Sequence, residues 1–489
     1  MMTENKGDIR YVGVKETFIY GIANAGQCFG YNIIAGSYLS LFFVKVFGIP
    51  SEIVGTMMLI LGLWDTFNDP LMGSIIDRTR TRYGKLRPYL FIVPIPLGLA
   101  TIMLFAGPEI LGDKAELTAK VIYMFITYFI WELFYTLGDV PFWGMSAAIS
   151  PSPSDRTRVI SSARFVSGLL GGISTPILTV LMDLSNNGVI PLSLSQVFLL
   201  MAIISGTFGM ALFSLSGICT KERVVQTIKE PSILDGFKAL VKNKPLLLIV
   251  IGNVLAAVSG IGGFFQAYYY SEVVQMNSLT IIISLPGTIL GFITYLLIPK
   301  VKKKFDNRQI IFLNGFVRLV CGVVVFLVGM KCFTNLWVVV PLLMIQNFLF
   351  SFFNTINMVI PTEMIGDTID YMEWKTGERN EGVSFSVLTF VGKLTGSISG
   401  ALGGWLLPII GLTFVPISAT ETMTVKAYEQ TDFYIWAMFT LAPAVLGLLP
   451  LIPYIWYDLT GEKLKMVREE MTERRAKLSA EVSGGAENE

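Results

Sequence analysis

The chain has 489 residues, of which 53% are hydrophobic and 15% are charged, and its mean hydropathy is +0.62. A soluble protein of this composition would have too few polar side chains to cover its surface, so the composition predicts a membrane protein. The formal net charge of +1 provides no basic surface for nucleic acid, which we therefore exclude as a partner.

Twelve apolar segments follow one another along the chain, and each is long enough to cross about 30 Å of hydrocarbon as a helix. The expected spans are residues 17–46, 52–76, 88–107, 119–149, 158–184, 194–219, 245–272, 279–300, 309–331, 335–362, 381–411 and 431–457. The fold class that we predict is an all-α membrane protein with twelve transmembrane helices in two pseudo-symmetric six-helix bundles.

Basic residues are concentrated in alternate loops, such as 78–87 and 302–308, and are rare in the intervening loops. The positive-inside rule therefore places both termini in the cytoplasm of a multi-pass plasma-membrane protein. The expected parts are an N-terminal bundle at 1–219, a cytoplasmic middle loop at 220–244, a C-terminal bundle at 245–458 and a cytoplasmic tail at 459–489. The charged tail is expected to form a short helix that frays.

Two carboxylates lie near the end of the second segment. Asp65 and Asp69 are four residues apart and share one helix face, with Asn68 beside them. An aspartate in a membrane helix costs roughly 2.5 to 3.5 kcal/mol. A small cation or a proton is the natural compensator, so this pair is a candidate coupling site for ion-driven transport.

The fourth segment carries a second polar face. Thr136 and Asp139 are three residues apart, and Glu132 lies four residues before Thr136, so all three can share one face. Glu132 adds a carboxylate that either binds a second cation or shifts the coupling toward H⁺ by raising the pKa of a neighbour.

Two basic residues lie inside later segments. Lys393, in the eleventh, needs an acidic partner at that depth, and we hypothesise that it competes with the cation for Asp65 and Asp139. The alternative is that these carboxylates pair with Lys393 or Arg164 only to hold helices together. Arg318, in the ninth segment, either neutralises an acid or extends toward the cytoplasm.

Other classes of membrane protein have motifs that this sequence lacks. No G-x-x-x-x-G-K-[ST] phosphate loop is present, which argues against an ATP-driven pump. The chain has no histidine, and its four cysteines lack the spacing of a metal site, which argues against an enzyme. We expect no cofactor other than the coupling cation.

Four phrases carry a resemblance to a known family. They run from Trp64 to Pro70, from Gly73 to Pro88, from Tyr135 to Trp143 and from Gly366 to Gly377. In them the chain closely resembles the glycoside-pentoside-hexuronide:cation symporters, the melibiose permease group of the major facilitator superfamily. The resemblance implies the major facilitator fold and import of a small glycoside by symport with Na⁺ or H⁺, through alternating access.

The resemblance also implies roles for single residues in cation binding. Asp65, Asn68, Asp69 and Thr136 match the family's sodium-liganding positions, with Asp65 and Asp69 as the charged ligands of Na⁺. Asp139 matches the acidic residue that links the cation site to the sugar site. Hard oxygen ligands of this kind suit Na⁺, Li⁺ or H⁺.

For the sugar, Trp143 and Arg164 match family positions that supply a stacking surface and a donor, and Lys393 matches a lysine engaged with the acidic cluster. Where melibiose permease has a Lys-Asp pair in the first helix, this chain has Gln27 and Cys28. The missing acid disfavours melibiose and makes an anionic sugar more tolerable. Pentosides, xylo-oligosaccharides and glucuronides are therefore the expected substrates.

Charged residues on the cytoplasmic side are interpreted as a gate. They follow the second and tenth segments and are Asp77, Arg78, Arg82, Asp367, Asp370 and Lys375. Ion pairs between the two groups would hold the inner side closed and break when it opens. The alternative is a solvated basic loop that only satisfies the positive-inside rule.

Two other functions are compatible with this scaffold: a sodium-driven lysolipid carrier, and a sugar sensor that does not transport. The intact carboxylates on the second and fourth segments favour coupled transport. The expected partners are a small glycoside, Na⁺ or H⁺ and the lipid bilayer, and the protein is expected to be a monomer.

Overall fold

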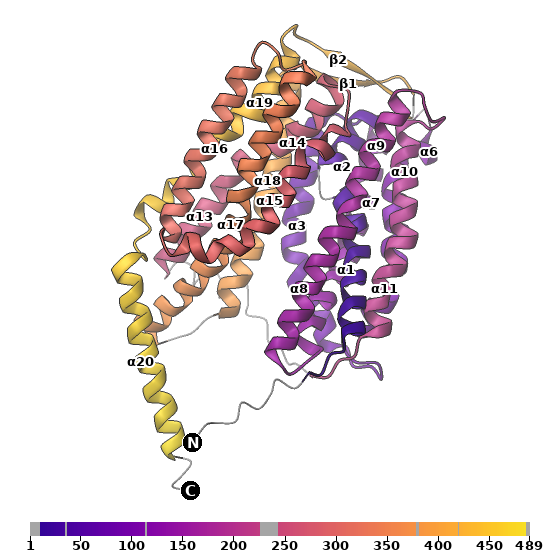
Figure 1. Ribbon diagram of the computed structural model, residues 1–489. Helices are drawn as coiled ribbons and strands as arrows, with labels where there is room; N and C mark the ends of the chain where they lie inside the picture. The colour runs from indigo at the N-terminus through magenta and orange to yellow at the C-terminus, as the bar shows by residue number, and fades with distance from the viewer. Residues whose placement is uncertain are drawn as a thin grey trace. The chain divides into compact units, whose positions relative to one another are not determined.

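The computed structural model describes residues 10–34, 37–112, 115–224, 243–377, 381–418 and 420–485. Helices dominate the described chain (Figure 1). It divides into two compact units, each built from segments distant in sequence. Unit 1 comprises Met1–Lys229, Gly263–Thr280 and Gly400–Ile435, and unit 2 comprises Glu230–Gly262, Ile281–Ser399 and Trp436–Glu489. Most of the predicted middle loop, at 225–242, lies outside the described residues.

The long helices of unit 1 run side by side (Figure 1). Its helices from the first half of the chain are α1 (Val14–Ile34), α2 (Ser37–Leu41), η1 (Phe42–Val46), α3 (Ser51–Arg78), α4 (Arg87–Ile92), α5 (Pro94–Phe105), α6 (Gly107–Leu111), α7 (Leu117–Ala148), α8 (Pro153–Leu170), η2 (Gly171–Ile173), α9 (Ser174–Asn186), α10 (Leu194–Ile204), η3 (Ser205–Gly209) and α11 (Met210–Cys219). The second half contributes α14 (Ile261–Tyr268), η4 (Tyr269–Val273) and the strands β1 (Leu412–Pro416) and β2 (Thr422–Lys426).

Unit 2 is built around the remaining helices, and three of these, α15, α18 and α19, also extend into unit 1. They are α13 (Lys244–Ser259), α15 (Leu279–Lys302), α16 (Asn307–Gly329), α17 (Leu336–Thr376), α18 (Glu381–Ile409), α19 (Thr431–Leu446), η5 (Leu449–Leu451), η6 (Pro453–Trp456) and α20 (Gly461–Gly485). A buried apolar cluster joins α13, α16, α17 and α20, with Ile249, Ile310, Ile365 and Val467 among its members.

The all-α membrane fold is confirmed, and the predicted spans coincide closely with helices or with helices broken at one turn. Among the described residues, seven helices are long and apolar enough to cross a membrane, or eight if α1 and the bent segment after it form one span. The number twelve stays a prediction. One cause of the lower number is local: Pro94 lacks a backbone N–H and separates α4 from α5, so neither piece reaches spanning length.

Three features of the connections go beyond the sequence predictions. The tenth predicted span continues as α17 to Thr376, where Gly377 in the left-handed region (φ 77°) ends it. The tail forms the 25-residue helix α20. The loop after α18 forms an antiparallel hairpin, β1–β2, in register from Leu412 opposite Lys426 to Pro416 opposite Thr422.

Helix packing in unit 1 depends on small residues. α1 lies against α8 and α11, and α3 lies against α7. A methyl group on Gly26 of α1 would collide with the carbonyl oxygen of Gly209, so only glycine allows this approach. These contacts, together with the contact between α7 and α8, bring the polar faces of α1, α3, α7 and α8 into one region.

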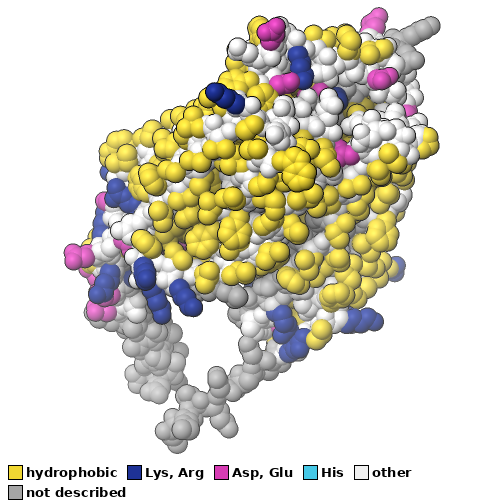
Figure 2. All heavy atoms as spheres, turned by 45° about the horizontal axis from the view of Figure 1, so that its top comes forward, with side chains coloured by type: hydrophobic (Ala, Val, Ile, Leu, Met, Phe, Trp, Pro, Cys, Tyr) yellow, Lys and Arg dark blue, Asp and Glu magenta, His cyan; other side chains and the backbone are white. Residues whose placement is uncertain are grey.

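The surface has the character expected of a membrane protein. One face carries hydrophobic side chains over most of its area, with Lys, Arg, Asp and Glu mainly near its margins (Figure 2). Exposed apolar side chains such as Ile95 (76% exposed) and Trp337 (91%) would be energetically unfavourable in water. A bilayer solvates them instead.

Candidate functional site

The predicted cation site lies between α3 and α7. The Thr136 hydroxyl of α7 donates a hydrogen bond to Asp65 Oδ1 of α3 at 3.3 Å. Asn68 is completely buried one turn along α3, and Asp69 beside it is half-buried. The structure therefore brings Asp65 and Thr136 together directly and places Asn68 and Asp69 on the adjoining turn.

Buried polar atoms near these residues lack protein partners. In the part of the chain that the structure describes, neither Oδ1 nor Nδ2 of Asn68 has a hydrogen-bond partner, and the same holds for Nε1 of Trp64. Leaving a buried polar group unsatisfied costs about 1 to 3 kcal/mol. A bound ion or its water would supply the missing interaction, and the amide oxygen of Asn68 is a suitable cation ligand.

Asp139 connects α7 to α1. Its Oδ1 accepts a hydrogen bond of 2.8 Å from Nε2 of Gln27, which is buried on α1. The thiol of Cys28 lies beside Ser167 of α8 and within electrostatic range of Asp139 and Arg164. Gln27 and Cys28, predicted as substrate-site residues, thus lie next to the acid that was predicted to link the two sites.

Trp143 and Arg164 meet across α7 and α8. The guanidinium carbon of Arg164 lies 4.2 Å from the centroid of a Trp143 ring, in a cation–π contact. Next to Trp143, the Phe142 ring stacks on Tyr20 of α1, with centroids 4.3 Å apart. The two predicted sugar-site residues therefore form one aromatic and basic surface, one turn beyond Asp139.

Three predicted residues have surroundings that the sequence left open. Glu132 is buried on α7, where the hydroxyl of Tyr128 hydrogen-bonds to it. Arg318 of α16 lies with its guanidinium carbon 5.4 Å from the Phe350 ring centroid, so an aromatic face covers it. Lys393 is half-buried on α18 in unit 2, and its predicted pairing with carboxylates of unit 1 stays a prediction.

One predicted gate residue of unit 2, Asp367, is bonded to the C-terminal helix α20. Oδ1 of Asp367, which is 5% exposed, accepts hydrogen bonds from Nε (3.1 Å) and Nη2 (2.6 Å) of Arg468 on α20. Arg468 also approaches Glu363 at 3.7 Å, and Lys302 forms an ion pair with Glu363. Burial raises the pKa of Asp367, and the Arg468 guanidinium opposes this shift. The sequence analysis missed Arg468, whose only signal was the charge density of the tail.

The other predicted gate residues have different surroundings in each unit. Lys375 is exposed, with its ammonium 5.8 Å from the Tyr371 ring centroid, and Asp370 is half-buried one turn beyond Asp367 on the same helix. In unit 1, Arg78 is exposed and Arg82 donates a hydrogen bond of 2.7 Å to the Tyr83 hydroxyl. The side chain of Asp77 lies outside the described residues. The predicted pairing between the two groups of gate residues stays a prediction.

The basic loop after α3 encloses a carboxylate that the sequence analysis did not single out. Glu222 accepts hydrogen bonds of 2.9, 2.9 and 3.0 Å from the backbone N–H groups of Lys85, Leu86 and Arg87, at the start of α4. A carboxylate at a helix N-terminus is favoured by the helix dipole. Gly84, with φ of 111°, allows the chain to turn closely around Glu222.

At the end of unit 1 predicted to face outward, a group that we call the outer network joins both halves of the sequence: Lys45, Ser271, Glu272 and Thr424. Lys45 Nζ lies 2.6 Å from Oε1 of Glu272 and 2.7 Å from the Ser271 hydroxyl. Thr424 of β2 donates to the other oxygen, Oε2, at 2.8 Å. Glu272 is 5% exposed, so this ion pair is largely dry. Sequence reasoning missed it, because its members lie far apart in the chain and share no local pattern.

Near the outer network, Asp183 of α9 makes a second connection to the second half of the sequence. Its Oδ1 accepts from the backbone N–H (2.7 Å) and the side-chain amide (3.0 Å) of Asn277, and its Oδ2 accepts from the Ser278 N–H at 2.7 Å. Two separate carboxylates thus bind this end of unit 1 together.

The described residues contain no group of three His, Cys, Asp or Glu side chains placed to hold a metal ion. A site made of Asp65, Asp69 and neutral oxygens does not need such a group. The predicted donor set of carboxylate, amide and hydroxyl oxygens remains suited to a hard monovalent cation.

Comparison with known proteins gives a consistent picture. The family model described as MFS/sugar transport protein matches residues 19–461. The chain is 28% identical to the inner membrane symporter YicJ of Escherichia coli K12, over 94% of this chain and 95% of the relative. It is 25% identical to the glucuronide carrier protein homolog of the same organism (93% and 95% covered), and 26% identical to the isoprimeverose transporter of Lactiplantibacillus pentosus (93% and 90%).

Solved structures resemble this chain in fold alone. The crystal structure of the nucleoside transporter NupG superimposes with a TM-score of 0.57 at 13% identity, covering 91% of this chain and 100% of that one. A bacterial homologue of the iron transporter ferroportin, in an inward-facing state, gives 0.58 at 14% identity and covers 91% and 98%. These likenesses indicate the arrangement of helices and carry nothing about the substrate.

Proposed function

The chain belongs to the family of MFS sugar transport proteins, so it is a multi-pass membrane transporter and not an enzyme, and we propose that it imports a glycoside by symport with Na⁺ or H⁺ through alternating access. The proposed coupling of ion and sugar transport rests on one observation, the polar group between α3 and α7. In this group Asp65 accepts a hydrogen bond from Thr136, and the amide of Asn68, one turn away, has no partner among the described residues.

The cation binds at the α3 end of this group. The carboxylates of Asp65 and Asp69 supply the negative charge, and Asn68 Oδ1 and the Thr136 hydroxyl supply neutral oxygens. Two carboxylates so close repel each other when the site is empty, and a cation or a proton relieves that repulsion. Na⁺, Li⁺ and H⁺ are all compatible with these ligands.

The glycoside binds beside Trp143, Arg164 and Asp139. The Trp143 ring provides a flat apolar surface for a sugar face, and the guanidinium held against it donates to hydroxyl or carboxylate oxygens. Gln27 donates a neutral hydrogen bond to Oδ1 of Asp139, and Arg164 is the basic group that can pair with the carboxylate of an acidic sugar. Pentosides, xylo-oligosaccharides and glucuronides are the proposed substrates, and the glucuronide carrier homolog and the isoprimeverose transporter among the relatives support this range.

The two sites are coupled through α7. Thr136 and Asp139 lie one turn apart on this helix. An ion bound to Thr136 therefore also restricts the motion of α7 at Asp139. The ion should therefore raise the affinity for the sugar, and linkage requires the sugar to raise the affinity for the ion by the same factor.

Alternating access requires contacts that close each side in turn. We propose that the outer network closes the outward side, and that Arg78, Arg82, Asp367, Asp370 and Lys375 act at the cytoplasmic side. The membrane orientation follows the positive-inside rule, with both termini in the cytoplasm. A monomer contains every element of this proposal.

The proposal is tested by uptake of labelled glycosides into proteoliposomes under an inward Na⁺ gradient or an inward proton gradient. Isoprimeverose, a glucuronide and melibiose form the panel. We expect uphill accumulation of one of the first two, driven by one ion and lost in Asp69→Asn. The matched control is Asp458→Asn, which removes an exposed carboxylate whose only described ion pair is with Lys463 at the surface, and which should transport normally.

A lysolipid carrier and a non-transporting sensor are the competing functions. A lysophospholipid that competes with the glycoside and accumulates in its place would support the carrier. Glycoside binding without accumulation under either gradient would support the sensor and contradict symport.

A further inference from the structure

Three aromatic side chains of unit 1 form a stack between α1 and α7 that the proposed function does not use. The Tyr135 ring of α7 stacks on Trp131 of the same helix, with centroids 4.9 Å apart and planes 17° apart. It also stacks on Tyr31 of α1, with centroids 5.1 Å apart and planes 22° apart. We call Trp131, Tyr135 and Tyr31 the aromatic stack.

The aromatic stack is fixed at one end and open at the other. Trp131 is 3% exposed, and its Nε1 donates a hydrogen bond of 3.1 Å to the hydroxyl of Thr101 on α5. Tyr135 is half-buried, and Tyr31 is 39% exposed. Tyr31 is therefore an accessible ring whose orientation is already set by the rings behind it. A ligand that stacks on such a ring does not have to order it first.

The surroundings of Tyr31 are polar. Tyr31 follows Gln27 by one turn of α1, and Tyr135 precedes Asp139 by one turn of α7, so the stacked tyrosines adjoin the Gln27–Asp139 hydrogen bond. The Tyr31 hydroxyl also lies within electrostatic range of the hydroxyls of Tyr128 and Tyr135. Such neighbours are expected of a ring beside a polar binding site and not of a ring that faces lipid.

The spacing along α7 separates the aromatic stack from Trp143. Tyr135, Asp139 and Trp143 follow one another at intervals of four residues. Each interval is about 6 Å along the helix axis, so Trp143 lies about 12 Å from Tyr135 in this direction. A single pyranose ring is too short to stack on Trp143 and also reach the aromatic stack, whereas two linked rings can contact both.

We infer that Tyr31 forms a second subsite, which binds the second ring of the glycoside, either a second sugar or a flat aglycone. The inference rests on the proposed function, because that proposal places the first sugar ring at Trp143. The flat faces of sugar rings and of aromatic aglycones are apolar and stack on aromatic side chains. The second subsite narrows the substrate class to glycosides of two rings and disfavours a free pentose.

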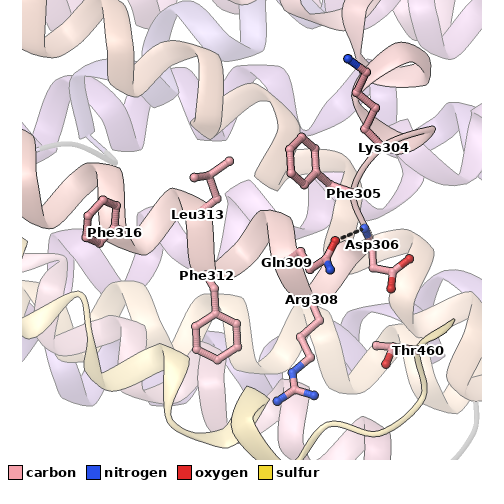
Figure 3. A pocket seen from close by; sticks show the side chains of 9 residues that line it. All are labelled: Lys304, Phe305, Asp306, Arg308, Gln309, Phe312, Leu313, Phe316 and Thr460. Carbon is pink, nitrogen blue, oxygen red and sulfur yellow. Dashed lines mark hydrogen bonds between the residues drawn. The ribbon is translucent and has the colours of Figure 1, made fainter.

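The groove at the start of α16 does not offer a comparable surface. It belongs to unit 2 and has a volume of about 700 Å³. Figure 3 shows that its phenylalanine rings, at Phe305, Phe312 and Phe316, point in different directions, and that Lys304 and Arg308 point to opposite sides. These side chains do not converge on one point, whereas the rings of the aromatic stack are nearly parallel.

The test is isothermal titration of the purified full-length protein, in a buffer with Na⁺ at fixed pH, with two matched pairs of compounds. Xylose and xylobiose test a second sugar, and methyl glucuronide and phenyl glucuronide test a flat aglycone. We expect the two-ring compound to bind more tightly in at least one pair. Tyr31→Ala should reduce this preference about fivefold, which is the size of one aromatic stacking contact.

The control variants separate stacking from packing. Tyr31→Phe keeps the ring and should restore the preference. Tyr31→Leu replaces the flat ring by a branched apolar side chain, so it provides the same test as Tyr31→Ala if that variant does not fold. The matched control is Phe125→Ala, which removes a ring of similar exposure (36%) from another stacked pair on α7, with Phe129, and should change no affinity.

The inference is overturned if the two compounds of each pair bind the unchanged protein equally, or if Tyr31→Ala and Tyr31→Leu keep the preference. An equal loss of affinity for both compounds of a pair would assign Tyr31 to packing and overturn it as well. These outcomes leave the proposed function intact. If none of the four compounds binds, the proposed glycoside substrates are contradicted, and the second subsite with them.

Discussion

At the scale of single residues, Asn68 is the most informative side chain. It is completely buried on α3, with neither amide atom bonded to a described residue. Asn24, on α1, is equally buried, but its Nδ2 donates to the Ala163 carbonyl at 3.2 Å. The two asparagines thus form a natural comparison between an amide that we propose binds the cation and an amide that bonds to a neighbouring helix.

We expect Asn68→Ala to lower Na⁺ affinity about tenfold or more while leaving thermal stability unchanged or higher. The reason is that the substitution removes a cation ligand and also an unsatisfied buried group. Na⁺-dependent thermal melting measures both quantities. Asn24→Ala should show the reverse, a loss of about 1 kcal/mol in stability with Na⁺ affinity retained. A stability loss in Asn68→Ala without a change in Na⁺ affinity would assign Asn68 to packing.

Asp367 lies beyond the apolar part of α17, which ends at Asn357, and its pKa is raised by burial. A raised pKa in the folded state means that the folded protein binds the proton more tightly than the unfolded chain does. The stability contributed by protonated Asp367 is therefore complete below its ordinary pKa and is lost as the pH rises through the raised value.

We accordingly expect the melting temperature of the unchanged protein, compared with Asp367→Asn, to fall as the pH rises through this window. Arg468 reduces the loss, because its guanidinium stabilises the ionised carboxylate. Melting curves at closely spaced pH values for both proteins measure the difference. Asp458→Asn serves as the control, since it removes an exposed acid from the same unit. A difference curve that does not vary with pH would remove Asp367 as the titrating group.

At the scale of elements, the outer network depends on two widened helical turns. Lys45 lies on η1 and Glu272 on η4, and both turns close with backbone hydrogen bonds over five residues, from Phe47 to Phe42 and from Val274 to Tyr269. Such π-turns redirect side chains relative to a regular helix. Strand β2 then supplies Thr424 to the same carboxylate.

We expect Glu272→Gln to open the outward side more often, because it leaves the half-buried ammonium of Lys45 without its counter-ion in the closed state. Cys28, half-buried on α1 beside Ser167, is a native reporter for the central region. In a background with Ser at Cys219, Cys321 and Cys332, a membrane-impermeant maleimide added outside should label Cys28 about tenfold faster in Glu272→Gln. This factor corresponds to a shift of about 1.4 kcal/mol between the closed and open states.

The matched control is Glu421→Gln, which removes an exposed acid from the turn between β1 and β2. Its labelling rate should equal that of the background protein. Equal rates for Glu272→Gln and the background would show that the outer network does not control access.

At the scale of the whole molecule, the central expectation is thermodynamic coupling. The proposed ion site and the proposed sugar site share α7, through Thr136 and Asp139. A ligand can shift the protein only by its difference in affinity between states, so the two ligands must help each other equally.

We expect saturating Na⁺ to raise glycoside affinity about five- to 150-fold, the usual range of coupling, and saturating glycoside to raise Na⁺ affinity by the same factor. Isothermal titration of each ligand, with and without the other, measures the two factors. Thr136→Ala removes the hydroxyl that touches Asp65 and should reduce both factors together. Affinities that do not respond to the second ligand would show that the two sites are independent.

Much of the architecture could be predicted from local sequence. Hydropathy located the helices, since each apolar segment must satisfy its own backbone hydrogen bonds in lipid. Helical periodicity placed Asp65 with Asn68 and Asp69, and Glu132 with Thr136, because neighbours on a helix face depend only on spacing. The hairpin β1–β2 was missed, although the β-branched residues in it are typical of strands, because the segment was read as a loop between spans.

The contacts that join distant segments could not be obtained in this way. Gln27 meets Asp139 across 112 positions, and Arg468 meets Asp367 across 101. Neither pair has a local pattern, because each forms only when two helices pack at one particular register. The sequence alone determined that this protein is a helical membrane transporter with carboxylates inside its spans. Only the tertiary structure decided which side chains those carboxylates meet, since partners far apart in the chain are chosen by packing and not by periodicity.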